Sequence, residues 1–214
     1  MSNYIITIAR GYGSGGSHIG KKLSKALGIP YYDTEILEKA SELSGINSAY
    51  FYEANEKISK GQLRMRKDKC AYTGKIYGPY DDKFLSNENL FNYQAEVIKS
   101  LALEGKQSCI IIGKAANKII GSLKNVVTVN VQAPMDYCIA NIVERLQINT
   151  VEARNKIIEI NEYREKYYKY YVGGDWSNMT EYDLNINTAS LGEDFAVQMI
   201  IDYLDSKKLI DRKK

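Results

Sequence analysis

A glycine-rich stretch that directly follows an apolar run constrains the fold of this chain more than any other feature. The apolar run covers residues 5–8, five glycines follow between residues 11 and 20, and the helical spacing of apolar residues begins at Ile19. This order predicts a buried strand, a tight loop and a helix start. Glycines let the loop turn its amides inward, and the first N–H groups of a helix favour an anion. The stretch is therefore predicted to bind phosphate, with a glycine-rich connection that binds nothing as the alternative.

The loop lacks the lysine of the usual phosphate-binding signature, G-x-x-x-x-G-K-[ST]. In that signature the lysine reaches the β and γ phosphates and the hydroxyl holds magnesium. If Gly11 and Gly16 are the paired glycines, Ser17 stands in the place of the lysine, and if residues 13–15 form the turn, Gly16 does. His18, in the first turn of the helix, is a poor magnesium ligand, and is either a phosphate contact or a plain helix-start residue. The basic residues that could replace the lysine are Arg10, Lys21, Lys22, Arg64 and Arg66, each with a solvent-exposed or surface ion-pair role as the alternative.

Apolar, β-branched runs alternate with helical spacing along the rest of the chain. Strands are expected near residues 30–33, 109–114, 126–131 and 182–188, with helices between them, and Thr34 is predicted to cap one of these helices. Continuous apolar runs are typical of strands buried on both faces of a parallel sheet. The alternation indicates a three-layer α/β domain with right-handed crossovers. Because ligands bind at the carboxyl ends of such strands, the loop at 11–18, Asp33 and residues 113–114 are expected at one edge.

Length and composition favour a single domain over residues 1–214. A chain of 214 residues with 44% hydrophobic content can form one sizeable core. The apolar pattern weakens between residues 48 and 87, which are expected to form an inserted, mobile lobe over the acceptor side of the site. Residues 150–176 are expected to form a lid with a long charged helix.

Charge and cysteine content argue against several classes of partner. The 29 basic and 26 acidic residues are spread along the chain, so no nucleic-acid partner is indicated. The three cysteines are far apart and odd in number, which favours neither a disulfide framework nor a metal cluster, and no metal ligand is assigned. No signal-type segment or bilayer-length apolar stretch is present, so a cytoplasmic protein without a membrane partner is expected. The oligomeric state is left open.

Six short segments occur in an order that is typical of one kinase family. They are residues 12–16, 19–23, 27–33, 111–114, 133–134 and 182–188, and they span nearly the whole chain. Together they resemble the cytidylate kinase-like branch of the P-loop nucleoside monophosphate kinases. The resemblance implies a three-layer P-loop kinase fold, in which helices flank a parallel central sheet and a mobile insertion or lid covers the site.

The same resemblance implies a reaction and a set of site residues. The reaction would transfer the γ phosphoryl group of magnesium-ATP to a small-molecule nucleotide, a nucleoside monophosphate such as CMP. The residues at the ATP phosphates would be Gly11, Tyr12, Gly13, Ser14, Gly15, Gly16, Ser17 and His18. The residues at the acceptor would be Asp33, Thr34, Gly113, Lys114, Asn161 and Arg164. Of these, Lys114 and Arg164 would be catalytic.

Several positions depart from the pattern of that family. Lys114 stands where arginine is usual, and lysine keeps the charge but loses the bidentate fork. Asparagine stands where aspartate is expected at positions 55, 117 and 161, and Cys138 stands where arginine is expected. Each change from aspartate to asparagine removes a negative charge. Two alternatives therefore stay open: a nucleotide-binding protein with impaired catalysis, and a kinase of a non-nucleotide small molecule on the same fold.

Five tyrosines lie between Tyr163 and Tyr171 in the expected lid helix. They are predicted to pack this helix against the core, with stacking on a base or a partner, together with Trp176, as the alternative.

Overall fold

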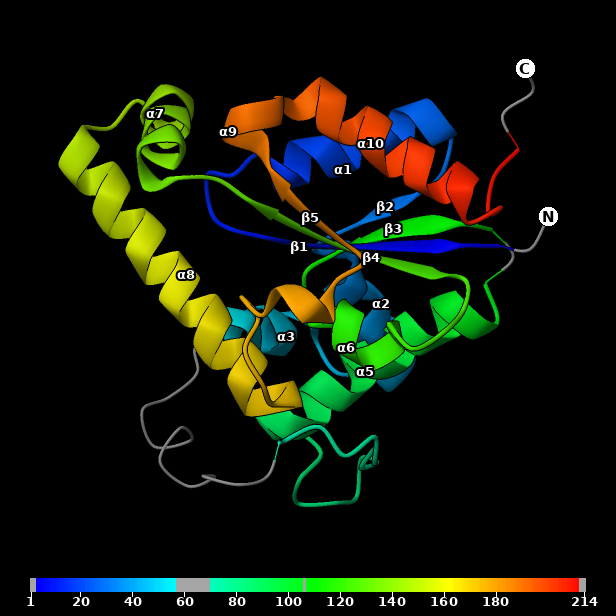
Figure 1. Ribbon diagram of the computed structural model, residues 1–214. Coiled ribbons are helices and arrows are strands. Elements are labelled where there is room, and N and C mark those ends of the chain that lie inside the picture. The colour runs from blue at the N-terminus through cyan, green and yellow to red at the C-terminus, as the bar shows by residue number, and fades with distance from the viewer. Residues whose placement is uncertain (1–2, 57–69, 106, 212–214) are drawn as a thin grey trace.

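A five-stranded parallel sheet lies at the centre of the computed structural model (Figure 1), which describes residues 3–56, 70–105 and 107–211. The strand order is β2-β3-β1-β4-β5, and every neighbouring pair is parallel. The strands are β1 (Ile5–Arg10), β2 (Tyr31–Tyr32), β3 (Cys109–Ile112), β4 (Val126–Gln132) and β5 (Leu184–Asn187). The predicted three-layer α/β fold with a parallel central sheet is confirmed.

The register of the three central strands explains why their apolar runs are continuous. Ile5 of β1 pairs with Cys109 and Val126, and all three side chains belong to the core on one face of the sheet. The next residue of each strand belongs to the core on the other face. A hydrophobic core therefore covers each face of the sheet. A polar residue at every second position would be buried, so these strands are mostly apolar along their whole length.

Helices cover both faces of the sheet, and two more lie beyond its carboxyl edge (Figure 1). The first face carries α1 (Gly16–Leu27), α9 (Thr188–Leu191) and α10 (Glu193–Ser206). The second face carries α2 (Glu35–Ser44), α3 (Ser48–Glu56), α5 (Asn87–Leu103) and α6 (Ala116–Ile120). Beyond the carboxyl ends of the strands lie α7 (Met135–Leu146) and α8 (Thr150–Val172), and a short 3-10 turn, η1 (Met179–Glu181), precedes β5. No described helix is both long enough and apolar enough to cross a bilayer.

The structure differs from the sequence-based expectation at two helix starts. The sequence did not predict α3, because its apolar residues show little helical periodicity, yet Phe51 is fully buried in the core beside α2 and α5. Thr34 precedes α2 as predicted, but its side chain makes no capping hydrogen bond because its backbone is already helical. Instead, the Asp33 N–H donates to the Glu35 carboxylate at 2.8 Å. The predicted role of Thr34 as a side-chain cap is wrong.

The tyrosines of α8 pack this helix against α5, as predicted. Tyr171 stacks on Phe91 with ring centroids 4.2 Å apart, and Tyr167 meets Phe91 edge-on at 5.8 Å. Tyr167, Tyr168, Tyr170 and Tyr171 are all buried. One end of α8 is thus fixed to the core while its middle crosses the carboxyl edge of the sheet.

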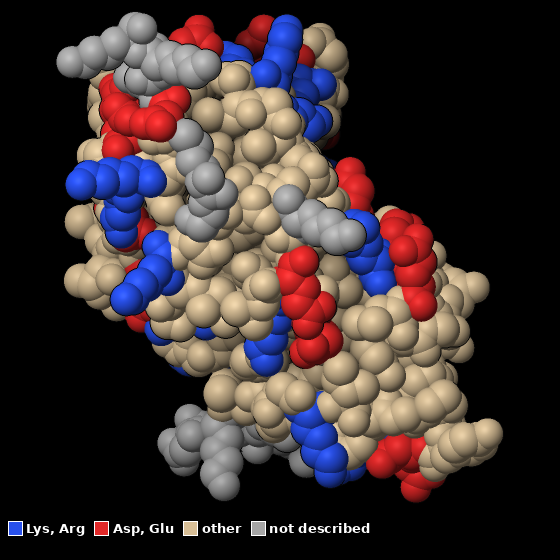
Figure 2. All heavy atoms as spheres, turned by 90° about the vertical axis from the view of Figure 1, so that its right-hand side faces the viewer, with Lys and Arg blue, Asp and Glu red and all other residues tan. Residues whose placement is uncertain are grey.

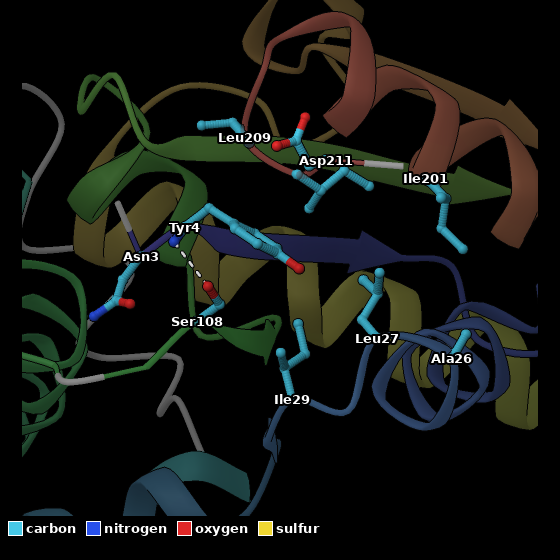
Figure 3. A pocket seen from close by; sticks show the side chains of 10 residues that line it. Asn3, Tyr4, Ala26, Leu27, Ile29, Ser108, Ile201, Leu209 and Asp211 are labelled. Carbon is cyan, nitrogen blue, oxygen red and sulfur yellow. Dashed lines mark hydrogen bonds between the residues drawn. The ribbon is translucent and has the colours of Figure 1, made fainter. Parts of the chain in front are cut away.

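The opposite edge of the sheet carries little that would attract an anion. A hollow of about 530 Å³ lies there, lined by both described chain ends, Asn3 and Asp211 (Figure 3). Apolar side chains such as Ile29 and Ile201 surround Tyr4, whose N–H donates to the Ser108 hydroxyl at 3.0 Å. Among the described residues that line this hollow, none is basic. Over the face that holds both ends, basic and acidic side chains are interspersed (Figure 2).

Candidate active site

The glycine loop between β1 and α1 is fixed by contacts with α7 and with the end of β4. Gly13 and Gly15 have φ angles of 86° and 84°, which favour glycine. A Cβ at Gly13 would lie 2.8 Å from the Cys138 carbonyl oxygen, so the loop packs tightly on α7. The hydroxyl of Ser14 is buried within 2.9 Å of the Gly11 carbonyl oxygen and 3.0 Å of the Val131 carbonyl oxygen. The loop is therefore a rigid platform rather than a slack connection.

The helix start beyond the loop leaves amide groups open. Among the described residues, the N–H groups of Gly16, Ser17 and His18 have no hydrogen-bond acceptor, whereas the Ile19 N–H donates to the Gly15 carbonyl at 3.0 Å. Open N–H groups at the positive end of a helix form an anion site. This part of the chain fits the phosphates of a nucleotide.

The other residues near the start of α1 that could contact phosphate lie on the surface of the molecule. His18 Nδ1 lies 3.3 Å from Glu193 Oε1, and more than half of its side chain is exposed. Lys22 pairs with the same glutamate at 3.0 Å and with Asp194 at 2.8 Å. Lys21 is exposed. Arg64 and Arg66 lie outside the described residues. Lys22 is thus engaged in the surface ion pairs that were the alternative to a phosphate contact.

Two helices hold the outer edge of the loop. From α8, Asn161 accepts a hydrogen bond from the Tyr12 N–H at 2.8 Å, and Arg164 Nη1 donates to the Arg10 carbonyl at 2.9 Å. From α7, Asn141 Nδ2 donates to the Gly13 carbonyl at 2.9 Å. The Tyr12 ring lies beneath two guanidinium groups, with Arg145 at 5.1 Å and Arg164 at 5.7 Å from its centroid. The position of α8 is therefore coupled directly to the loop.

A cavity of about 1190 Å³ opens beside the loop, where β1, β2 and β3 end. Of the described residues that line it, five are basic and three are acidic. Arg10, Lys114 and Arg164 line it from three separate segments, and Asp33, directly after β2, is the only carboxylate next to a strand among the described lining residues. Tyr163, Tyr167, Tyr168, Tyr182 and Trp176 form an aromatic wall. The cavity thus combines excess positive charge with planar apolar surface.

Lys114 stands in a strained turn and is an unusual lysine. Gly113, Lys114 and Ala115 have φ angles of 66°, 54° and 53°, and each residue other than glycine in this region costs about 1–2 kcal/mol. The Lys114 Nζ donates to Asn55 Oδ1 of α3 at 2.6 Å. Burial lowers the pKa of Lys114 from 10.5 to about 8, against the attraction of Asp33 and with further repulsion from Arg10 and Arg164. Because Asn55 is neutral, the lysine charge is left available to an anion.

The two arginines of the cavity are also largely withdrawn from solvent, though neither is fully buried. Burial lowers the pKa of Arg164, and the neighbouring Arg10 lowers it further. Burial likewise lowers the pKa of Arg10, whose Nη2 lies 3.5 Å from Asp33 Oδ1. Arginine stays protonated in proteins, so these groups remain cations. Three partly buried cations with Asp33 as their nearest carboxylate form a site that an anion would stabilise.

The structure brings most of the predicted site residues together. Asp33, Thr34, Gly113, Lys114 and Arg164 all line the cavity, and residues 11–18 directly follow Arg10, which also lines it. Asn161 does not line the cavity, since its amide is turned to the loop. Asn117 donates to the Tyr168 hydroxyl at 3.0 Å, and Cys138 is buried under Gly13.

Asn141 and Arg145, which contact the loop from α7, were not predicted from the sequence. They are four residues apart, and Asn161 and Arg164 on α8 are three apart, so each pair shares one helix face. Polar pairs at helical spacing on two adjacent helices were the signal for these contacts. Asn55 had no comparable signal, because its partner Lys114 is distant in sequence.

The low pKa of Lys114 predicts a pH dependence. Lysine is a cation only below its pKa, so the kcat/KM for an anionic acceptor is expected to fall as the pH rises through about 8. In the unfolded chain this lysine keeps its proton up to about pH 10.4. Between about pH 8 and 10.4 the unfolded state therefore binds more protons, and this group makes the free energy of unfolding rise as the pH rises. In Lys114→Arg the fall of kcat/KM is expected to disappear, because arginine stays charged. A pH profile of kcat/KM that is the same in both proteins would contradict this role.

The bond between Asn161 and the loop predicts a measurable stability difference. Asn161→Leu leaves the Tyr12 N–H without its acceptor and is expected to lower the free energy of unfolding by about 1–2 kcal/mol. Asn161→Asp keeps an acceptor oxygen and is expected to stay close to the parent. Urea unfolding of the three proteins measures this difference. Equal losses in both variants would show that the hydrogen bond does not matter.

Comparisons with known proteins agree on a kinase-type fold. A model of the cytidylate kinase-like family matches residues 5–190. An uncharacterized protein from Eubacterium ventriosum is 24% identical, with a TM-score of 0.70, and the match covers 95% of this chain and 99% of that one. Shikimate kinase from Bacteroides thetaiotaomicron is 14% identical, with a TM-score of 0.53 and coverage of 94% and 98%. Shikimate kinase from Acinetobacter baumannii, solved with shikimate, is 13% identical, with a TM-score of 0.50 and coverage of 98% and 97%. No curated protein matches the chain.

Proposed function

The chain belongs to the cytidylate kinase-like family, and from this premise we propose that it transfers the γ phosphoryl group of ATP to a small-molecule acceptor. The first candidate for the acceptor is a nucleoside monophosphate such as CMP. Such a reaction would draw on the ATP of the cytoplasm. The observation that carries the proposal is the convergence of Lys114 and Arg164 on one cavity beside an open phosphate loop.

The chemistry of phosphoryl transfer suits this arrangement. Catalysis in this class is mostly positioning and neutralisation of charge, with little covalent work for the protein. The open N–H groups of residues 16–18 would hold the phosphates of ATP, which supplies the phosphoryl group when bound. Lys114 would bind the acceptor phosphate, and Asp33 and Thr34 would orient the acceptor at the ends of β2 and α2. Arg164, already joined to the loop, would reach the phosphoryl group in transit.

Magnesium would arrive with the nucleotide on this proposal. This cation is commonly bound by substrate phosphates and water together with one or two carboxylates. Asp33 faces the Arg10 guanidinium at 3.5 Å, so a cation already lies beside it. No residue of the chain is assigned as a metal ligand.

Movement of two segments would accompany the reaction. Part of the expected acceptor-side lobe, residues 57–69 of 48–87, lies outside the described residues, and α3 within it packs on the core through Phe51. Residues 150–176 would form the lid. Closure of such segments excludes water and completes the site. Because α8 carries Arg164 and contacts the loop, its movement would place or withdraw a catalytic cation.

Two alternatives are kept because specific residues favour them. The neutral Asn55 beside Lys114 and the absent loop lysine fit a protein that binds nucleotide with little turnover. A non-nucleotide acceptor fits the same cavity, and two of the similar structures are shikimate kinases. Shikimate therefore belongs in the set of acceptors to be tested.

The test measures ADP formation from magnesium-ATP with CMP, UMP, AMP, GMP and shikimate, one at a time. A thermal-shift measurement on the same samples reports binding without turnover, since a ligand of the native state raises the melting temperature. ADP formation that depends on CMP or UMP supports the first candidate, and ADP formation with shikimate alone supports the non-nucleotide alternative. Stabilisation by ATP without ADP in any sample favours the binding protein. No change in either measurement would overturn the proposal.

A further inference from the structure

Arg10 occupies a place that two glycines keep open. It is the last residue of β1 and immediately precedes the loop. A Cβ at Gly16 would lie 2.5 Å from the Arg10 Cβ, and a Cβ at Gly113 would lie 2.1 Å from its Nη1. The side chain therefore runs from the start of α1 to the turn after β3, between the phosphate loop and the cavity.

The guanidinium of Arg10 is buried with incomplete pairing. Its side chain is 17% exposed, and its carboxylate neighbour, Asp33, lies at 3.5 Å, which is long for an ion pair. The Nε atom is buried and has no hydrogen-bond partner among the described residues. Removal of a cation from water costs free energy that weak pairing does not restore. An anion bound at this point would supply the missing acceptor.

Arg10 is also joined to the proposed catalytic groups. Arg164 donates to the Arg10 carbonyl at 2.9 Å, so the two guanidinium groups approach the cavity from one connected unit. Lys114 follows Gly113, against which the Arg10 guanidinium lies. Of the other basic residues considered, Lys22 is engaged by Glu193 and Asp194. Arg10 is thus the best-placed described cation between the loop and the acceptor side.

We propose that Arg10 supplies the charge that the lysine of a usual phosphate loop would supply, by contacting the phosphoryl group as it passes from ATP to the acceptor. This inference rests on the proposed function. In the transfer, the bond from the γ phosphorus to the bridging oxygen breaks and ADP leaves. A bond forms to an oxygen of the acceptor phosphate, which is a dianion and loses no proton. Arg10 would neutralise the charge on the oxygens of the transferred group.

The test compares Arg10→Met and Arg10→Lys with a matched control, Arg154→Met. Arg154 lies on the exposed side of α8, 52% exposed, in a 3.7 Å pair with Asp136, and such pairs contribute little. Arg10→Met is expected to lower kcat about 100-fold, with a smaller change in the KM for the acceptor. Arg10→Lys, which keeps the charge without the fork, is expected to fall between Arg10→Met and the parent. Arg154→Met is expected to match the parent.

Two further measurements separate a catalytic role from a structural one. Replacement of a poorly paired buried cation by an apolar side chain often leaves stability unchanged or higher, so Arg10→Met is expected to keep the parent melting temperature. Millimolar guanidinium is expected to restore part of the kcat of Arg10→Ala by entering the vacated space. A large fall in melting temperature without rescue, or kcat values equal to the parent, would overturn the inference.

Failure of the proposed function can be told apart from failure of this inference. If the parent forms no ADP with any acceptor, the proposed function is wrong. Binding of ATP and ADP is then followed by the fluorescence of Trp176, the only tryptophan of the chain, which lines the cavity. Loss of the preference for ATP over ADP in Arg10→Met alone supports the contact between Arg10 and the γ phosphate. An unchanged preference, or a parent without one, overturns it.

Discussion

Replacement of Arg164 by methionine is expected to lower kcat by about 1000-fold, because a guanidinium that reaches a phosphoryl group in transit contributes a factor of this order. Arg164 is partly buried at the cavity, and one of its N–H groups already donates to the Arg10 carbonyl. The other N–H groups of its fork remain for the ligand. The KM for ATP is expected to change less than kcat, since open backbone amides hold the nucleotide phosphates.

Steady-state kinetics of Arg164→Met beside Arg154→Met makes this comparison on a single helix. Arg154 is an exposed arginine on the same helix, so a general effect of losing an arginine from α8 would appear in both variants. A kcat of Arg164→Met within threefold of the parent would show that this arginine only anchors α8. Loss of ATP binding in Arg164→Met would also contradict the proposal, which assigns that binding to the loop.

Gly13→Ala is expected to abolish the stabilisation of the protein by ATP. At 100 times Kd a ligand stabilises a native protein by about 2.7 kcal/mol. The φ angle of Gly13 is 86°, and the new Cβ would lie 2.8 Å from a carbonyl oxygen and 3.0 Å from the Cα of Cys138. Because these are backbone atoms, the loop itself must move. Its N–H groups would then no longer point to one phosphate position. The melting temperature of the free protein is expected to fall as well.

Gly28→Ala provides the matched control for this loop variant. Gly28 ends α1 with a φ of 65°, and no atom of the described residues lies within 4 Å of a Cβ built there. Its substitution is expected to cost only the backbone strain of about 1 kcal/mol and to leave the shift caused by ATP intact. If Gly13→Ala keeps the full shift caused by ATP, residues 11–18 are not the nucleotide site.

The sheet could be predicted from the sequence because its signal is local and repeated. Runs such as residues 109–112 are apolar on both faces, which is typical of a buried strand in a parallel sheet. The helix α3 was not predicted because it has few apolar residues, and their spacing shows little helical periodicity although Phe51 is buried. Its helical state depends on packing against α2 and α5, which the sequence does not display.

The site could be predicted to the level of strand ends and no further. Topology alone brings Asp33, Gly113 and the loop to one edge, so their proximity followed from the order of the elements. The direction of a side chain did not follow. Asn161 was expected at the acceptor, and the structure shows it accepting a hydrogen bond from the Tyr12 N–H of the loop. The roles of these residues in binding and catalysis stay predictions.

Asn3 and Asp211 both lie at the edge of the sheet opposite the cavity (Figures 1 and 3). A tether attached to either end would therefore leave the mouth of the cavity free. Immobilised on a sensor surface through one end and labelled with a dye through the other, the molecule would present its ligand-binding side to the solution. Surface-based affinity measurements and fusion to another protein are thus compatible with the geometry of this fold.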